Sequence, residues 1–200
     1  MKKVLVIGHS FVRRADKHYQ LGLEGIKPNL GLIDAVITFR GWSGLTVQKL
    51  EDKSFVVDNQ DPDILVIDIG SNDLANGADP VMLARRVNNL ARAWLINTSI
   101  QVVICMEVLP RSQSAVYPAP QDFNDRAEDF NVHLLDLAHS YRDQVIVAPL
   151  QRIKRDIHLY RHSDGVHLSG RKHHKATQSG IFKYLLSIKT AVVRGLRLCN

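Results

Sequence analysis

The chain has 200 residues, of which 45% are apolar, 23% charged and 6% aromatic. This length and balance predict one globular domain over residues 1–200 and exclude a disordered or fibrous protein. The mean hydropathy is −0.11. No apolar run approaches the ~18 residues that a membrane helix needs, so the sequence predicts no membrane-spanning helix and no membrane partner.

The N-terminus and the cysteines bear on the cellular compartment. Lys2 and Lys3 precede a short apolar run at residues 4–7, which resembles the start of a signal peptide. The run is too short for that purpose, so it predicts a strand and no targeting segment. Cys105 and Cys199 are too few for a disulfide framework. The sequence therefore predicts a cytoplasmic protein.

The charge balance permits contact with nucleic acid or anionic surfaces but identifies no partner. The chain carries 26 Lys and Arg against 20 Asp and Glu, which gives a net charge of +6 and a pI near 9.4. The excess lies mainly in the last third, at Arg152, Lys154, Arg155, Arg161, Arg171, Lys172, Lys175, Lys183, Lys189, Arg194 and Arg197. On helices such residues usually form a solvated outer face, and this interpretation is favoured over nucleic-acid binding.

Five short apolar runs rich in β-branched residues alternate with segments of helical period. The runs lie at residues 4–7, 35–39, 64–69, 102–106 and 145–147. Continuous apolar runs of this length are typical of parallel strands that are buried on both faces. The alternation of strands and helices predicts an α/β protein, a three-layer α/β/α sandwich with a five-stranded, mainly parallel sheet.

Three amphipathic helices are predicted between and after these strands. Asp79 and Pro80 supply an N-cap and a first-turn proline for a helix that continues to about residue 95. A second helix is predicted at about residues 122–141. The last is predicted to begin after Ser169. Its buried stripe consists of Ile181, Tyr184, Leu185, Ile188 and Val192.

The polar segments that follow the apolar runs hold the candidate functional residues. In open parallel sheets ligands bind beyond the carboxyl ends of the strands, so these segments should meet at one edge of the sheet. They are residues 8–10, 40–44, 70–73 and 107–111, together with 163–168 before the last helix.

Four sequence blocks in this order resemble the SGNH branch of the GDSL hydrolases. The blocks are Val6-Ile7-Gly8-His9-Ser10-Phe11, Trp42-Ser43-Gly44, Gly70-Ser71-Asn72-Asp73 and Asp164-Gly165-Val166-His167-Leu168-Ser169. One such block occurs by chance in many proteins, whereas four in order over nearly the whole chain are specific. The resemblance implies a flavodoxin-like sheet, hydrolysis of esters through a serine, and no requirement for a metal or cofactor.

By that resemblance Ser10 is the nucleophile, His167 is its base and Asp164 orients the base. The oxyanion hole would consist of the backbone N–H groups of Ser10 and Gly44 and the side-chain amide of Asn72. A serine hydroxyl needs a neighbouring base, and a carboxylate on the far ring nitrogen fixes the imidazole tautomer. Gly44 is expected to let the backbone approach the reacting centre, which a Cβ would hinder.

The first block departs from the family pattern at two positions. Position 9, usually Asp, is His9, and position 11, usually Leu, is Phe11. Since the family's Asp is not one of the three catalytic residues, the change bears on local packing and substrate choice. Adjacent residues on a turn point apart, so His9 is not expected to be the base.

A narrower similarity rests on Gly8-His9-Ser10-Phe11 and on Val108-Leu109-Pro110-Arg111 after the fourth strand. Both segments are similar to esterase-like domains in the first-reading-frame proteins of some LINE-type retrotransposons. That similarity would give the basic surface an RNA-associated context.

Each candidate catalytic residue also has a purely structural interpretation. Ser10 could cap the following helix, Gly44 could be a turn glycine, and Asn72 could serve the geometry of its loop. Asp164 and the glycine after it form a common turn pair, and His167 could be an exposed loop histidine. The four blocks together favour the catalytic interpretation.

Other residues near these blocks have weaker claims. Trp42 could line the substrate pocket, although burial under its loop is the commoner arrangement. Arg111 could hold an anionic group or lie on the surface, with equal weight. Asp73 is expected to bind nearby backbone. No glycine-rich nucleotide-binding motif follows the first strand.

A group of histidines near the C-terminus raises a zinc hypothesis. They are His158, His162, His167, His173 and His174. Zinc sites need three or four well-spaced ligands, and neither H-E-x-x-H nor a pair of C-x-x-C motifs is present. The sequence therefore favours the catalytic role of His167 over a metal site.

The sequence as a whole predicts an esterase for short acyl groups such as acetyl, because the chain has no spare length for a lid or a lipid tunnel. One rival is a catalytically vestigial module that binds nucleic acid through its basic surface. That binding would weaken with salt and ignore the substitution Ser10→Ala. The other rival is an acyltransferase that uses the same residues with water excluded.

Overall fold

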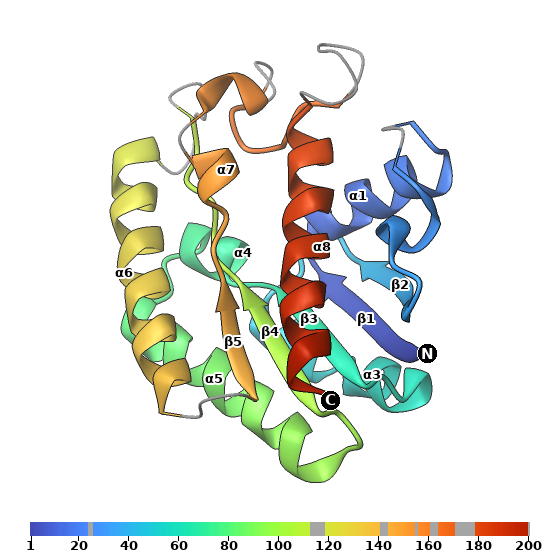
Figure 1. Ribbon diagram of the computed structural model, residues 1–200. Coiled ribbons are helices and arrows are strands. Elements are labelled where there is room, and N and C mark those ends of the chain that lie inside the picture. Colours follow the sequence, from blue (N-terminus) through green and yellow to red (C-terminus); the bar gives the residue numbers. More distant parts are fainter. Residues whose placement is uncertain are drawn as a thin grey trace.

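The computed structural model describes residues 1–23, 26–112, 119–140, 144–154, 156–160, 164–170 and 179–199. These residues form a five-stranded sheet in the order β2-β1-β3-β4-β5, with every neighbouring pair parallel (Figure 1). The strands are β1 (Lys2–Gly8), β2 (Ala35–Gly41), β3 (Ile64–Asp68), β4 (Val102–Met106) and β5 (Val145–Ala148). All five predicted strands are confirmed.

Helices cover both faces of the sheet, so the predicted three-layer sandwich is confirmed. α1 (Ser10–Gln20) and α8 (Gly180–Leu198) pack with one face in one apolar cluster. α5 (Pro80–Asn97) and α6 (Pro120–His139) pack with the other face in a second cluster. The short elements, which the sequence analysis did not predict, are η1 (Pro28–Gly31), α2 (Val47–Glu51), α3 (Ser54–Gln60), α4 (Ser71–Ala75), α7 (Gln151–Lys154) and η2 (Ile157–Leu159).

The central strands have the two-sided burial that their sequences predict. In β1, Val4 and Val6 enter one apolar cluster and Leu5 and Ile7 enter the other, because successive side chains of a strand point to opposite faces. The expectation of two-sided burial is wrong for β2, where Val36 is 45% exposed. β2 is an edge strand, and Val36 and Arg40 on one of its faces are both exposed.

The predicted start of α5 is confirmed, and that of α8 is wrong. The carboxylate of Asp79 accepts the N–H of Met82 at 2.8 Å and caps α5. The helix was predicted to begin after Ser169, whose hydroxyl and carbonyl oxygens accept the N–H groups of Gly180 and Ile181. α8 is capped by Ser179 and begins with the next residue, and residues 171–178 lie outside the described ranges. The predicted stripe of α8 is buried at Ile181, Tyr184, Leu185, Ile188 and Val192.

No helix in the described ranges combines the length and apolar composition needed to cross a bilayer. Cys105 and Cys199 are both free thiols. Burial in β4 raises the pKa of the Cys105 thiol to about 12, so this residue stays protonated near neutral pH and cannot act as a thiolate nucleophile.

Candidate active site

Segments that follow different strands are joined at the carboxyl edge of the sheet. The N–H of His9 donates to the carbonyl of Asp68 at 3.2 Å, which connects the ends of β1 and β3. After β4, the N–H of Ser112 donates to the carbonyl of Gly165 at 2.9 Å. The loop before α8 is therefore tied to the same edge, where ligands bind in open parallel sheets.

Ser10 is the first residue of α1, directly after the turn that ends β1. The N-cap is His9, whose Nδ1 accepts the N–H of Phe11 at 3.4 Å. The interpretation of Ser10 as the helix cap is therefore wrong, and its hydroxyl is left for other contacts.

Two glycines make the tight turn between β1 and α1 sterically possible. A Cβ at Gly8 would collide with the carbonyl oxygen of Asp68. A Cβ at Gly41, at the end of β2, would collide with the backbone of Arg13 in α1. The end of β1 therefore lies against the end of β3, and the first turn of α1 lies against the end of β2, which fixes the position of Ser10.

The imidazole of His167 bridges Ser10 and Asp164. Its Nε2 lies 3.0 Å from Oγ of Ser10, and its Nδ1 lies 3.1 Å from Oδ2 of Asp164. The serine and the histidine are 157 positions apart in the sequence. The side chains of His167 and Asp164 are 30% and 32% exposed. The three residues thus form one hydrogen-bonded chain that solvent can reach.

Asp164 is held by the backbone of its own loop. Its Oδ1 accepts the N–H of Val166 at 2.9 Å and that of His167 at 2.8 Å. Partial burial alone would raise the pKa of Asp164, but these two N–H donors and the imidazole together hold it below its ordinary value. The turn interpretation and the orienting interpretation are therefore compatible, since the turn keeps the carboxylate ionised beside the ring.

Gly44 lies in the loop between β2 and α2 with φ of +66°, in the left-handed region that favours glycine. A Cβ there would meet no atom within 4 Å. The positive φ gives a structural reason for this glycine, and its expected role in the approach of the backbone to the reacting centre stays a prediction. Nζ of Lys49 donates to the carbonyl of Gly44 at 3.3 Å, leaving the N–H of Gly44 outside this contact.

α4 holds this loop through two side chains. Nδ2 of Asn72 donates to the carbonyl of Leu45 at 2.8 Å, and a primary amide has a second N–H besides. The carboxylate of Asp73 accepts the N–H of Val47 at 3.0 Å, so the expected backbone contact of Asp73 is confirmed. Burial raises the pKa of Asp73 despite this N–H donor. The predicted oxyanion segments around Gly44 and Asn72 are thus linked directly.

Trp42 and Arg111 are both packed against the protein interior. Trp42 is half-buried against the apolar cluster that contains α5 and α6, and Nζ of Lys53 lies 5.6 Å from its ring centroid. The guanidinium of Arg111 lies 4.1 Å from the ring centroid of Phe123, and burial lowers its pKa. Their substrate contacts stay predictions.

The zinc hypothesis gains no support from the residues that the structure describes. Within them, no three His, Cys, Asp or Glu side chains are grouped so as to hold a metal ion. His162, His173 and His174 lie outside the described ranges. His167 contacts Ser10 and Asp164 instead.

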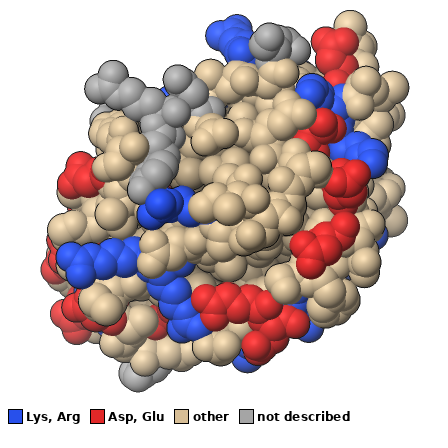
Figure 2. All heavy atoms as spheres, turned by 90° about the horizontal axis from the view of Figure 1, so that it is seen from below, with Lys and Arg blue, Asp and Glu red and all other residues tan. Residues whose placement is uncertain are grey.

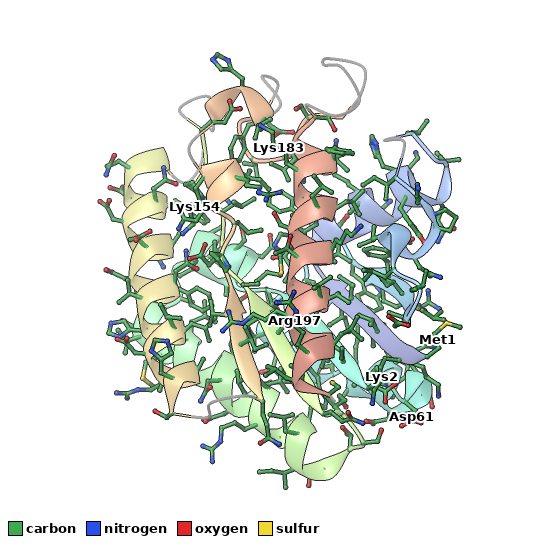
Figure 3. The ribbon with its side chains drawn as sticks, viewed as in Figure 1. Met1, Lys2, Asp61, Lys154, Lys183 and Arg197 are labelled. Atoms are coloured by element: carbon green, nitrogen blue, oxygen red, sulfur yellow. The ribbon has the colours of Figure 1, made fainter. Side chains whose placement is uncertain are left out.

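Part of the positive charge of the last third is neutralised by neighbouring acids. Lys154 pairs with Glu107 at 3.0 Å, and Lys183 pairs with Asp156 at 3.3 Å (Figure 3). On the face seen from below, opposite the carboxyl edge, basic and acidic side chains are interspersed around the rim (Figure 2). Some cations of the last third lie outside the described ranges, namely Arg155, Arg161, Arg171, Lys172 and Lys175. Nucleic-acid binding stays a prediction.

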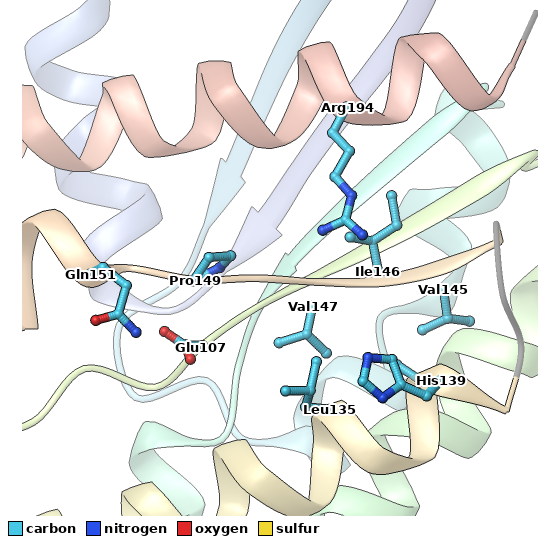
Figure 4. Close-up of a pocket in the computed structure, with 10 residues that line it drawn as sticks. Glu107, Leu135, His139, Val145, Ile146, Val147, Pro149, Gln151 and Arg194 are labelled. Carbon is cyan, nitrogen blue, oxygen red and sulfur yellow. The ribbon is translucent and has the colours of Figure 1, made fainter.

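A hollow of about 320 Å³ lies between α6, β5 and α8 (Figure 4). Arg194 extends over it from α8, and Glu107 and Gln151 lie at one end. None of Ser10, Asp164 and His167 lines it. This hollow is therefore separate from the candidate active site.

Sequence reasoning missed a second polar cluster, which includes His9, the residue that precedes Ser10. Nε2 of His9 lies 3.2 Å from Oδ1 of Asp68, and the phenol of Tyr184 donates to Oδ2 of the same carboxylate. The one signal in the sequence is that Asp68 is a charged residue within an apolar run predicted to be buried on both faces.

A parallel sheet between two helical layers, with a serine, a histidine and an aspartate joined at its carboxyl edge, is typical of hydrolases that act on esters. The family model described as GDSL-like Lipase/Acylhydrolase family matches residues 19–175. The chain therefore belongs to the GDSL-like lipase/acylhydrolase family and is a hydrolase of ester bonds. The matched range includes Gly44, Asn72, Asp164 and His167 but begins after Ser10.

Solved structures show the same fold. A GDSL-like lipase from Bacteroides thetaiotaomicron is 20% identical, with a TM-score of 0.66 over 96% of this chain and 88% of the other. A G-D-S-L family lipolytic protein from Veillonella parvula is 16% identical, with a TM-score of 0.67 over 94% and 98%. A catalytic mutant of an acetylxylan esterase from Geobacillus stearothermophilus is 16% identical, with a TM-score of 0.65 over 98% and 94%. A search of curated protein sequences returned no match.

Proposed function

We propose that this hydrolase is a serine esterase that cleaves short-chain carboxylic esters, acetyl esters above all, through an acyl-enzyme intermediate. The observation that carries the proposal is the contact between Oγ of Ser10 and Nε2 of His167 at 3.0 Å, with Asp164 on the other ring nitrogen. This is the distance at which an imidazole can take the proton of a hydroxyl.

In the first half of the reaction, Oγ of Ser10 attacks the ester carbonyl while Nε2 of His167 takes its proton. The carbonyl π electrons move to the oxygen, and the N–H groups of Ser10 and Gly44 and the amide of Asn72 stabilise the oxyanion. When the carbonyl re-forms, the bond to the alkoxide oxygen breaks. His167 gives its proton to that oxygen, the alcohol leaves, and the acyl group stays on Ser10.

In the second half, a water molecule repeats the attack on the acyl-enzyme. His167 takes a proton from the water and returns it to Oγ of Ser10 as the acid departs. Asp164 stabilises the imidazolium formed in each half, since its carboxylate is held ionised by two backbone N–H groups. No metal or cofactor enters either half.

Exposure of the site favours hydrolysis over acyl transfer. The side chains of His167 and Asp164 are 30% and 32% exposed, so water can reach the acyl-enzyme, whereas transfer to another acceptor requires its exclusion. One protein of the same fold is named as an acetylxylan esterase, which supports a small acyl group on the substrate.

Turnover of p-nitrophenyl acetate by the purified protein tests the proposal. We expect hydrolysis in the presence of a metal chelator, and loss of hydrolysis in Ser10→Ala with an unchanged melting temperature. An added alcohol acceptor should leave the yield of free acetate unchanged. Wild-type protein that turns over neither p-nitrophenyl acetate nor butyrate would contradict the proposal, and acetylated alcohol as the main product would identify a transferase.

A further inference from the structure

His9, which precedes Ser10, forms a buried polar unit with Asp68 and Tyr184. These residues are 3%, 2% and 1% exposed, and they come from the β1–α1 turn, the end of β3 and α8. The Asp68 carboxylate contacts Nε2 of His9 at 3.2 Å through one oxygen and accepts the phenol of Tyr184 through the other. A buried carboxylate with a donor on each oxygen holds its donors firmly, because the loss of either is costly in an apolar interior.

The contacts of His9 define its tautomer. Nδ1 accepts the backbone N–H of Phe11, so the lone pair is on Nδ1 and the proton is on Nε2, which donates to Asp68. Both ring nitrogens are therefore occupied, and His9 cannot serve as a base. Its backbone N–H donates to Asp68 and its carbonyl accepts the N–H of Arg13, so the residue next to Ser10 is fixed at four points.

The ring of Phe11 connects this unit to His167 in the candidate active site. Its ring centroid lies 4.9 Å from that of His9, 6.0 Å from that of Tyr184 and 6.0 Å from that of His167. Phe11 is 7% exposed. The two positions that depart from the family pattern, His9 and Phe11, are thus in contact with each other, and the second of them packs against the imidazole that faces Ser10.

We propose that His9, Asp68 and Tyr184 are positioning residues that set the geometry between Ser10 and His167. The inference rests on the proposed function. The unit anchors the first turn of α1, which places Oγ of Ser10, and through Phe11 it supports one side of the His167 ring. It touches neither substrate nor reacting atoms, so it acts on the chemical step by placing the residues that do.

Two substitutions at His9 separate its two hydrogen bonds. In His9→Gln the amide nitrogen can take the place of Nε2 and still donate to Asp68. In His9→Asn the amide oxygen can take the place of Nδ1 and still cap α1, but the side chain is too short to reach Asp68. A misplacement of about 1 Å costs on the order of 100-fold in rate. We therefore expect a kcat about 10- to 100-fold lower in His9→Asn, with KM within about twofold, and a substantial recovery in His9→Gln.

Tyr184→Phe tests the other donor and keeps the ring that packs on Phe11. We again expect a kcat about tenfold lower with KM little changed. Tyr19→Phe is the matched control, because the Tyr19 hydroxyl accepts the N–H of Asn29 at 2.6 Å near the other end of α1. Its kcat should equal that of the wild type.

The same kinetics show which claim fails. If the wild type hydrolyses p-nitrophenyl acetate and Tyr184→Phe retains the wild-type kcat, the positioning role is wrong while the esterase stands, whether or not His9→Asn folds. A lower melting temperature with unchanged kcat would likewise mean a structural role only. If the wild type turns over no ester, both proposals are overturned.

Discussion

Two hydrogen-bonded chains of histidine, aspartate and hydroxyl within the described residues have opposite surroundings. In the outer chain, Asp164 holds one nitrogen of His167 and the other nitrogen faces the Ser10 hydroxyl, with the acid and the base about one-third exposed. The inner chain is the buried polar unit described above, in which Asp68 lies between His9 and the Tyr184 hydroxyl and all three residues are buried.

The two histidines differ in their hydrogen-bond partners and in their exposure to solvent. Nε2 of His167 faces a hydroxyl that can give up its proton, whereas Nδ1 of His9 is occupied by the N–H of Phe11. The same residue types therefore support a reacting centre in one place and a rigid support in the other. The residue types alone do not distinguish the two chains, whereas their hydrogen-bond partners do.

The largest effect on kcat should come from removing the hydroxyl of Ser10 or the imidazole of His167. Ser10→Ala and His167→Ala should each lower kcat for p-nitrophenyl acetate by about 10⁴-fold or more, because nucleophile and base act as one unit. Circular dichroism should show the fold retained in both variants. A residual rate above about a tenth of the wild-type rate in Ser10→Ala would remove the distinction between the two chains.

Removal of the negative charge of Asp164 should have the second-largest effect on kcat. Asp164→Asn should lower kcat by about 10³- to 10⁴-fold, because the amide no longer enforces the tautomer or stabilises the imidazolium. Asp156→Asn is the control, since it also removes an exposed carboxylate partner, in this case that of Lys183. Steady-state kinetics should show little change in the control, and an equal loss in both variants would point to a general charge effect.

Loss of the predicted oxyanion donor should have a smaller effect. Asn72→Ala should lower kcat by about 10²- to 10³-fold, since one donor to the developing charge is lost. Asn97→Ala is the comparison variant, because Asn97 also donates from Nδ2 to a backbone carbonyl, that of Ala93 at 2.8 Å, at the end of α5. If Asn72→Ala retained the wild-type kcat, Asn72 would only hold the loop at Leu45.

The smallest expected effect is that of Asp164 on the pH dependence of the protein's stability. The pKa of Asp164 is lower in the folded protein than its ordinary value of 3.8, so its ionised form stabilises the fold at pH values above that. This contribution is lost as the pH falls through the lower folded-state value. Melting temperatures of the wild type and Asp164→Asn should therefore differ near neutral pH and converge in acid. A difference that grows in acid would contradict the assignment.

The sheet and its main helices follow from the sequence because each depends on a local pattern. Apolar runs predicted all five strands, and the Asp79–Pro80 pair predicted the start of α5. The predicted start of α8 after Ser169 was wrong, because the apolar stripe marks the buried face of the helix and not its first residue, and the N-cap is Ser179. The contact between Ser10 and His167 was predicted from the resemblance to a family, because no local pattern indicates it.

The contacts among His9, Asp68 and Tyr184 could not be predicted from the sequence, because each of these residues already has a local explanation. Tyr184 belongs to the apolar stripe of α8, Asp68 ends a strand, and His9 caps a helix. Their contact depends on how α8 crosses the sheet, which is a tertiary property. The interpretation of Gly44 as a turn glycine fits the left-handed backbone of the loop between β2 and α2, and its role at the reacting centre stays a prediction.

Reaction with a fluorophosphonate, followed by intact-mass and peptide mass spectrometry, tests the central claim most directly. Such a reagent phosphonylates a serine hydroxyl that an adjacent base activates. The account predicts a single adduct on Ser10 in the wild type, and none in Ser10→Ala or His167→Ala. An adduct on another residue, or ester turnover by a wild-type protein that takes up no label, would contradict it.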